Sequence, residues 1–219
     1  MVIAEQISLI NKQLNDSAAR LIVVTKTRSL EELQETYAAG AIEFGENRVQ
    51  EMVEKQAVLP KNILWHQIGH LQTNKVKYIA EFVHLIHAVD SLKLLQEINK
   101  QALKHNRVIA CLLQFYIADE ETKFGLSREE AKLLLSSESY SALQNIKIIG
   151  VMGMASFVDD TNQIRNEFKA LQAIFSEIKH NYFSDQTSFK EISMGMSGDF
   201  QLAIEEGSTM VRIGSSLFS

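Results

Sequence analysis

The sequence predicts an α/β protein built as a single (β/α)8 barrel of the TIM type with an extra N-terminal helix. Strand-like and helical patterns alternate along the 219 residues, which is typical of right-handed βαβ units and a parallel sheet. The strand-like runs number eight, which fits a closed barrel better than an open doubly wound sheet in a chain of this length. No linker-like segment interrupts the pattern, so we expect one domain over residues 1–219.

The expected strands are short apolar runs that end in polar or glycine-containing turns. In chain order they cover residues 21–26, 41–45, 63–69, 84–90, 108–115, 146–154, 189–196 and 210–218. Apolar residues at helical spacing predict helices, among them 2–14, 29–39, 91–105 and 161–178. The second of these begins with Ser29 and Glu32, the signature of a capping box. No helix follows the eighth strand, so the N-terminal helix is expected to cover that position.

The composition excludes several classes of protein. The formal net charge is −5 and there is no long run of lysine or arginine, which argues against a nucleic-acid-binding protein. No apolar stretch approaches the ~20 residues of a membrane span. The single cysteine, Cys111, lies within an apolar run and is expected to fill the core. One cysteine and no recognisable signal peptide lead us to expect a cytoplasmic protein.

Lys26 directly follows the first strand-like run, in which four apolar residues precede Thr25 and the lysine. In an α/β barrel, the carboxyl ends of the strands open onto the active site. A lysine partly withdrawn from water there can act as an amine nucleophile and form a Schiff base. Alternatively, Lys26 reaches solvent from a strand end and has no chemical role.

The seventh strand-like run combines small residues with apolar ones. Its alternation places Ser193, Gly195 and Ser197 on one face and Ile192, Met194 and Met196 on the other. A face of glycine and hydroxyl residues lets a ligand approach the backbone. A helix is expected to start near Gly198, so that free N–H groups face the same place.

The eighth run ends in Arg212, followed by Gly214 and Ser215, which again combines a cation with small and hydroxylic residues. The loops after strands seven and eight commonly bind phosphate in such barrels. We therefore expect a phosphate site here, against the alternatives that Ser197 merely caps a helix and that Gly214 merely forms a turn.

The remaining reactive residues do not indicate a site. His66 and His70 straddle a strand end, and His84 and His87 are expected on opposite sides of a strand. No cluster has the spacing of metal ligands. The methionines are expected to fill the core; they include Met152, Met154, Met194 and Met196.

A lysine amine and a phosphate pocket on one barrel face have two usual meanings. One is a Schiff-base aldolase that acts on sugar phosphates. The other is a protein that binds pyridoxal 5′-phosphate (PLP), in which the lysine holds the aldehyde and the pocket holds the phosphate.

Several motifs resemble one family along nearly the whole chain, from about residue 21 to residue 218. They are VTKT at 24–27, FGENRVQE at 44–51, WHQIG at 65–69, LQTNK at 71–75, KFG at 123–125, SMGMS at 193–197 and GSTMVRIG at 207–214. Together they are similar to the pyridoxal phosphate homeostasis protein family, also described as alanine racemase N-terminal-like or proline synthase co-transcribed proteins.

The resemblance implies a barrel with PLP on Lys26 as a Schiff base and Arg212 beside the pyridine nitrogen. It also implies phosphate contacts from Ser193, Ser197, Gly214 and Ser215, and it places Asn47 in a motif that lines the cofactor mouth. This sequence departs from the family at four places: Ser29 and His70 replace prolines, Ala88 replaces a serine, and Tyr116-Ile117-Ala118-Asp119 replaces a different turn. The last two bear on the shape of the cofactor rim.

We expect a cofactor carrier that serves vitamin B6 homeostasis and cofactor delivery, with no catalytic residue, rather than an enzyme. An arginine beside the ring nitrogen disfavours its protonation and weakens the electron sink that PLP enzymes use. A two-base racemase also needs a second acid/base opposite the lysine, and only Tyr116 lies near a strand end. The alternatives are a racemase-like PLP enzyme acting on amino acids and a cofactor-free aldolase. The expected partners are the cofactor and PLP-dependent apoenzymes, with no nucleic acid and no membrane, and we expect a monomer.

Overall fold

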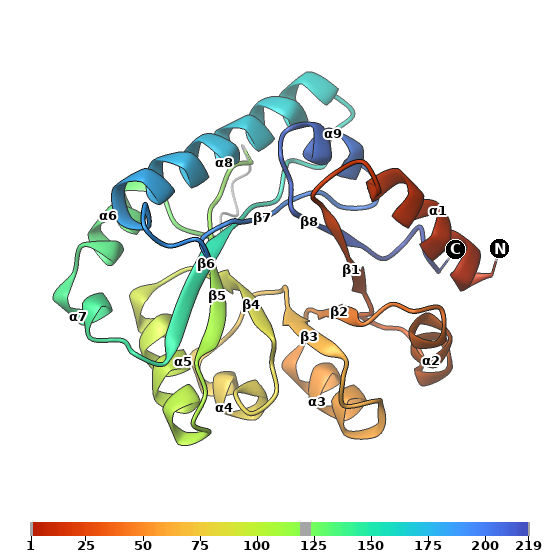
Figure 1. Ribbon diagram of the computed structural model, residues 1–219, viewed down its shortest axis with the longest axis horizontal. Helices are drawn as coiled ribbons and strands as arrows, with labels where there is room; N and C mark the ends of the chain where they lie inside the picture. The colour runs from red at the N-terminus through yellow and green to blue at the C-terminus, as the bar shows by residue number, and fades with distance from the viewer. Residues whose placement is uncertain (1, 119–123, 219) are drawn as a thin grey trace.

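Eight parallel strands close into a barrel in sequential order, as seen in a computed structural model that describes residues 2–118 and 124–218 (Figure 1). The strands are β1 (Arg20–Val24), β2 (Glu43–Glu46), β3 (Leu64–Gln67), β4 (Leu85–Val89), β5 (Ile109–Gln114), β6 (Ile146–Met152), β7 (Glu191–Ser193) and β8 (Met210–Ile213). Because β1 pairs with both β2 and β8, the sheet has no edge. The predicted (β/α)8 barrel is confirmed, and the open doubly wound sheet is excluded.

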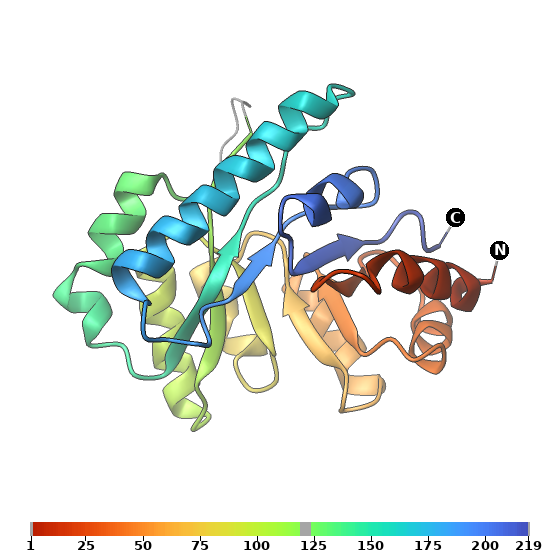
Figure 2. The ribbon, with the colours of Figure 1, turned by 45° about the horizontal axis from the view of Figure 1, so that its top comes forward.

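Helices surround the barrel, and the longest of them, α8, runs across the outside of the sheet (Figure 2). The helices are α1 (Ile3–Leu14), α2 (Leu30–Ala38), α3 (Val49–Val58), the 3-10 turn η1 (Thr73–Lys75), α4 (Val76–Ile79), α5 (Leu92–Lys104), α6 (Arg128–Leu135), α7 (Glu138–Ser141), α8 (Thr161–Tyr182) and α9 (Phe200–Glu205). Among the described residues, none of these helices is long and apolar enough to cross a membrane.

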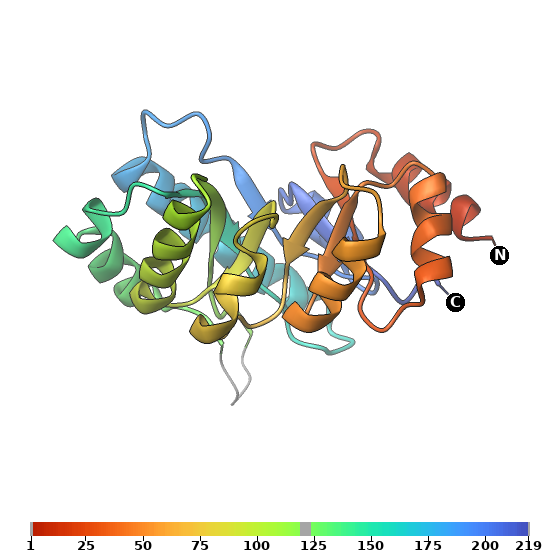
Figure 3. The ribbon, with the colours of Figure 1, turned by 90° about the horizontal axis from the view of Figure 1, so that it is seen from below.

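The N-terminal helix α1 occupies the position that an eighth crossover helix would take. It lies outside the junction of β1 and β8, between α9 and α2 (Figure 1), and buries Ile3, Ile7, Ile10 and Leu14. The first and last described residues consequently lie side by side on one flank of the barrel (Figure 3). The expectation for this helix is confirmed.

Local sequence signals set several helix ends. The capping box predicted at Ser29 is present, because Glu32 N donates to Ser29 Oγ at 3.3 Å and Ser29 N donates to Glu32 Oε2 at 2.7 Å. A second box joins Ser127 and Glu130 at the start of α6. Each box satisfies backbone N–H groups that have no partner within the helix.

The strands separate two apolar regions. Val23, Phe44 and Trp65 face the helices, as part of a large outer core. The barrel interior holds a small inner core made of Ile22, Leu85, Ala88, Leu112, Met152 and Met210. Because side chains alternate along a strand, Ile22 and Val24 point inward, and Lys26 continues this face above the inner core.

Some strands are shorter than the sequence predicts. The seventh was expected over 189–196, but β7 covers only Glu191–Ser193. Gly195 has a left-handed φ of 96°, so the chain turns there and the strand alternation stops. Met196 and Ser197 therefore do not lie on opposite faces, which corrects the predicted pattern.

Candidate functional site

A cavity of about 450 Å³ opens at the carboxyl end of the barrel, between β1, β8 and the loops after β6 and β7. We call it the mouth cavity. Its wall consists of Val24, Lys26, Thr27, Arg28, Ser156, Phe157, Val158, Asp159, Ile164, Met196, Ser197, Gly198, Asp199, Arg212, Gly214 and Ser215. Its volume is in the range of pockets that bind small molecules.

Lys26 enters this cavity as an exposed side chain. The expectation that it would be partly withdrawn from water is wrong, because the last buried residue of the β1 segment is Thr25 and the lysine extends beyond it. Among the described residues, no carboxylate lies within ion-pair distance of its ammonium group. The next residue, Thr27, has a positive φ of 60°, and its N–H donates to Glu51 Oε2 at 2.9 Å. Thus α3 helps to fix the turn that carries Lys26.

A buried ion pair supports the same turn from behind. Lys55 Nζ on α3 donates to the carbonyl oxygen of Thr25 at 2.7 Å and to Glu46 Oε1 at 2.6 Å. The Thr25 hydroxyl donates to the same Glu46 oxygen at 2.6 Å. Burial raises the pKa of Glu46, and the bonds from Lys55 and Thr25 counteract this rise. The pair joins β1, β2 and α3 directly behind Lys26.

Arg212 on β8 forms the inner wall of the cavity, with only 4% of its surface exposed. Its Nη1 donates to Ser193 Oγ at 2.5 Å, and its Nη2 donates to the carbonyl oxygen of Gly153 at 3.0 Å. Burial lowers the pKa of Arg212 to about 10, and the nearby Asp199 carboxylate acts in the opposite direction. The guanidinium is therefore still a cation at neutral pH, and its position is fixed from β6 and β7.

Hydroxyl and glycine residues form the wall between β7 and β8. Ser197 and Gly198 follow β7, and Gly214 and Ser215 follow β8. A Cβ atom on Gly198 would meet no atom within 4 Å, whereas one on Gly214 would lie 3.0 Å from Val24. Gly198 therefore leaves open space in the cavity, while Gly214 allows β8 to pass close to β1.

Asp199 places a carboxylate in the same wall. Its Oδ1 accepts a hydrogen bond from the backbone N–H of Met196 at 2.5 Å. Burial raises the pKa of Asp199, and the bond from Met196 and the charge of Arg212 oppose that rise. The helix α9 was expected to begin near Gly198 and begins at Phe200, with Asp199 as its N-cap residue.

The structure gathers five of the seven predicted cofactor-binding residues around the mouth cavity: Lys26, Ser197, Arg212, Gly214 and Ser215. Ser193 is fully buried beneath Arg212 and is not part of the cavity wall. Asn47 lies after β2, where its carbonyl oxygen accepts a hydrogen bond from Gln67 Nε2 at 3.0 Å, and is also outside the wall. Asp119 and Lys123, from two of the motifs, lie outside the described residues.

Sequence reasoning missed the loop after β6, where Ser156, Phe157, Val158 and Asp159 complete the wall. Glu167 on α8 holds this loop, because its two carboxylate oxygens accept bonds from Ser156 N and Ser156 Oγ, each at 2.7 Å. A glutamate on the apolar face of a predicted helix was the available signal, since a buried carboxylate needs partners.

The histidines also differ from expectation. His84 and His87 were expected on opposite sides of a strand, yet both rings contact His66, with centroid separations of 5.4 and 5.2 Å. The expectation assumed regular alternation, whereas His84 precedes β4 and the pairing of β4 with β5 shifts between Ile86 and Val89.

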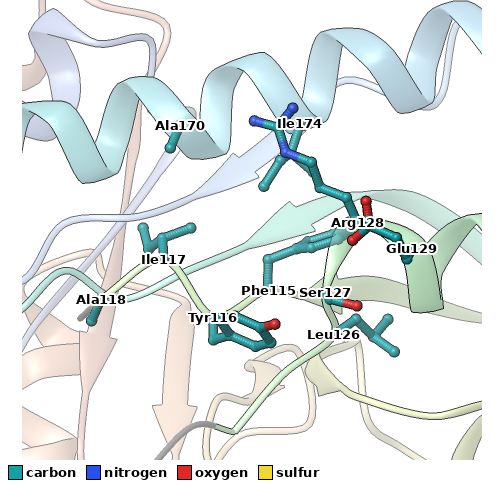
Figure 4. Close-up of a pocket in the computed structure, with 10 residues that line it drawn as sticks. All are labelled: Phe115, Tyr116, Ile117, Ala118, Leu126, Ser127, Arg128, Glu129, Ala170 and Ile174. Atoms are coloured by element: carbon teal, nitrogen blue, oxygen red, sulfur yellow. The ribbon is translucent and has the colours of Figure 1, made fainter. Parts of the chain in front are cut away.

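A second pocket of about 350 Å³ lies between the end of β5, α6 and α8 (Figure 4). Tyr116, Arg128 and Ile174 are among its lining residues. Arg128 is paired with Glu177 at 3.3 Å, and neither Lys26 nor Arg212 takes part in the lining. The mouth cavity is therefore the candidate site.

Comparison with known proteins agrees with this geometry. Residues 2–219 match the model of the family "Alanine racemase, N-terminal domain". The pyridoxal phosphate homeostasis protein of Aquifex aeolicus is 40% identical over 204 residues, which are 93% of this chain and 87% of the relative. The human protein of the same name is 37% identical over 212 residues, 91% of this chain and 75% of the relative.

Solved structures give the same result. PipY from Synechococcus elongatus, solved without PLP, has a TM-score of 0.91 at 33% identity and covers 99% of this chain and 100% of its own. Its PLP-bound structure has a TM-score of 0.88. Alanine racemase from Bartonella henselae, at 15% identity and a TM-score of 0.74, shares the fold over 99% of this chain and 58% of its own. The chain therefore belongs to the pyridoxal phosphate homeostasis protein family.

Proposed function

We propose that this protein binds PLP in the mouth cavity, holds it as a Schiff base on Lys26, and serves vitamin B6 homeostasis by releasing the cofactor to apoenzymes. The observation that carries the proposal is the meeting of Lys26, Arg212 and a wall of hydroxyl and glycine residues around one cavity. PipY, a relative with 33% identity, has a structure with PLP bound, which supports the same ligand here.

The residues present fit the chemistry of PLP. The Lys26 amine suits the aldehyde, because a primary amine condenses with an aldehyde to a Schiff base. Ser197, Gly198, Gly214 and Ser215 offer hydroxyl and backbone N–H groups for the phosphate. When bound, PLP would supply an aldehyde and a pyridine ring, and Arg212 is the side chain suited to the ring nitrogen.

The surroundings of the cavity favour a carrier over an enzyme. Arg212 is a cation and disfavours a proton on the ring nitrogen by like-charge repulsion, which weakens stabilisation of a carbanion. The cavity wall within the described residues contains no tyrosine or histidine that could act opposite Lys26. Lys26 itself is exposed, which suits a cofactor that must leave again.

The Schiff base is tested by titrating the purified protein with PLP and recording its visible absorbance. We expect a band that Lys26→Ala abolishes and that the control Lys104→Ala, on the exposed end of α5, retains. Reduction with borohydride and peptide mass spectrometry should then place the label on Lys26. An unchanged band in Lys26→Ala, or a label on another lysine, would remove Lys26 as the attachment point.

Delivery is tested by mixing the PLP-loaded protein with a PLP-dependent apoenzyme and following recovery of that enzyme's activity. Recovery faster than the measured release of PLP into buffer indicates direct transfer, and recovery at the release rate limits the role to buffering. Exchange of the α-proton of an amino acid in deuterated water, lost in Lys26→Ala, would instead establish an enzyme.

A further inference from the structure

A chain of four polar side chains crosses the interior of the barrel beneath the mouth cavity. It joins His66 on β3, His87 on β4, Ser193 on β7 and Arg212 on β8. His66 Nδ1 and His87 Nε2 are 2.9 Å apart, and so are His87 Nδ1 and Ser193 Oγ. Arg212 Nη1 completes the chain with its bond to Ser193 Oγ at 2.5 Å. The first three side chains are fully buried.

Counting donors and acceptors gives the chain a direction. The Arg212 guanidinium can only donate, so the Ser193 oxygen accepts from it and the Ser193 hydroxyl proton goes to His87 Nδ1. His87 then carries its own proton on Nε2 and donates it to His66 Nδ1. The opposite direction would leave both the Ser193 proton and a His66 lone pair without partners, whereas this one leaves a single unpaired group, the N–H at His66 Nε2.

Both imidazoles are neutral in this arrangement, as the direction requires. Burial lowers the pKa of His66 and of His87 well below the usual range, and neighbouring positive charges, including Arg212 in the case of His87, act in the same sense. A neutral His87 has one ring nitrogen free to accept the Ser193 proton, which a protonated His87 would not have.

The chain is unlike the rest of the barrel interior and carries an energetic cost. The side chains of the inner core are apolar, whereas His66 Nε2 is buried and has no partner among the described residues. Leaving a buried ring N–H unpaired is unfavourable. Stability alone would favour apolar residues at His66 and His87, so we look for a role in the site above them.

We propose that His87 is a positioning residue for Arg212, acting through the Ser193 hydroxyl, and that His66 fixes the tautomer of His87. By accepting the hydroxyl proton, His87 turns the lone pairs of Ser193 toward the guanidinium. Together with the Gly153 carbonyl, Ser193 then fixes two of the five N–H groups of Arg212 and leaves the others for a ligand. This inference rests on the proposed function, which assigns Arg212 to the PLP ring nitrogen.

The test is a double-mutant cycle on PLP binding to the full chain. His87→Leu removes the acceptor, Ser193→Ala removes the link, and each should weaken PLP binding about tenfold, as expected for loss of a hydrogen bond to a charged group. Because both act through Arg212, the double variant should also be about tenfold weaker, not a hundredfold. Both single variants should shift the visible band of bound PLP in the same direction, which a change in global stability alone would not do.

Two further variants provide rescue and control. His87→Asn keeps an acceptor near Ser193 and should bind PLP within about threefold of wild type. Ser208→Ala removes a buried hydroxyl that bonds the carbonyl oxygens of Met194 and Met210 outside the chain, and it should leave PLP affinity and the band unchanged.

Each outcome decides between the possibilities. A multiplicative loss in the double variant, or Ser193→Ala binding PLP as tightly as Ser208→Ala does, overturns the positioning role. Should His87→Leu fail to fold, as judged by circular dichroism, Ser193→Ala and His87→Asn decide the matter by the same criteria. A wild-type protein that gives no visible band with PLP overturns the proposed function itself, whereas a normal wild-type band with unmoved variants overturns this inference alone.

Discussion

Replacing Lys55 by methionine should destabilise the protein strongly, because the change leaves a carboxylate buried without its cation. Lys55 Nζ lies 2.6 Å from Glu46 Oε1, and Glu46 is fully buried. Methionine fills a similar volume but cannot donate a hydrogen bond. The Thr25 carbonyl, which Lys55 also holds at 2.7 Å, loses a partner at the same time.

The magnitude follows from the contacts that remain. Removing one partner of a buried ion pair typically costs about 3–5 kcal/mol. Glu46 keeps the bond from Thr25 at 2.6 Å, and its raised pKa allows it to take up a proton, so we expect the lower end, about 3 kcal/mol. In a protein of this size that corresponds to a fall of roughly 6–12 °C in the thermal midpoint.

The assay is thermal and urea unfolding followed by circular dichroism at neutral pH. Lys169→Met, a substitution of the same kind on the exposed face of α8, should change stability by less than about 0.5 kcal/mol. Adding Glu46→Gln to Lys55→Met should recover part of the loss, because the charge is then gone. A midpoint within about 2 °C of wild type for Lys55→Met, or a double variant less stable than Lys55→Met, would refute the reasoning.

Three further outcomes are expected. Because burial raises the pKa of Glu46 above its unfolded value of 4.5, the folded state binds more protons there and the wild type should gain stability relative to Glu46→Gln as pH falls toward 4.5 in parallel urea titrations; no gain would contradict the assigned shift. Gly150→Ala should yield insoluble or unfolded protein on expression, since its Cβ would lie 1.8 Å from the carbonyl oxygen of Glu191 on the neighbouring strand; a normally folded variant would show that this contact can relax. Asp199→Asn keeps an acceptor for Met196 N–H but removes a negative charge from the cavity wall, so it should tighten PLP binding several-fold in a fluorescence titration, and weaker binding would mean that the charge assists the ligand.

Much of the fold could be predicted because it rests on local patterns. Eight apolar runs separated by helical periodicity imply a parallel sheet that closes, and the capping box at Ser29 sets the start of α2. Strand ends were less predictable. Gly195 ends the alternation of the β7 segment through its left-handed φ, and nothing in the residue types around it distinguishes this glycine from one within a strand.

The candidate site was predictable where it depends on strand ends and less so where it depends on depth. Lys26 and Arg212 both follow from their positions on β1 and β8, and both line the cavity. Whether a hydroxyl faces the ligand or the residue beneath it depends on packing across the barrel, which is why Ser193 is found under Arg212. The bonds between His87, on β4, and Ser193, on β7, join residues 106 positions apart, and no local pattern reports such a contact.

The pairing of β1 with β8 has a consequence for how the protein is made. Lys26 follows the first strand and Arg212 lies on the last, so the two sides of the cavity are synthesised nearly a whole chain length apart. A nascent chain that lacks β8 has Lys26 but no inner wall, and it cannot bind PLP in this way. Closure of the barrel is a long-range event that comes late in folding, and a ligand that spans the β1–β8 seam stabilises only the closed form. Cofactor loading would therefore select completed molecules and lock the last strand to the first.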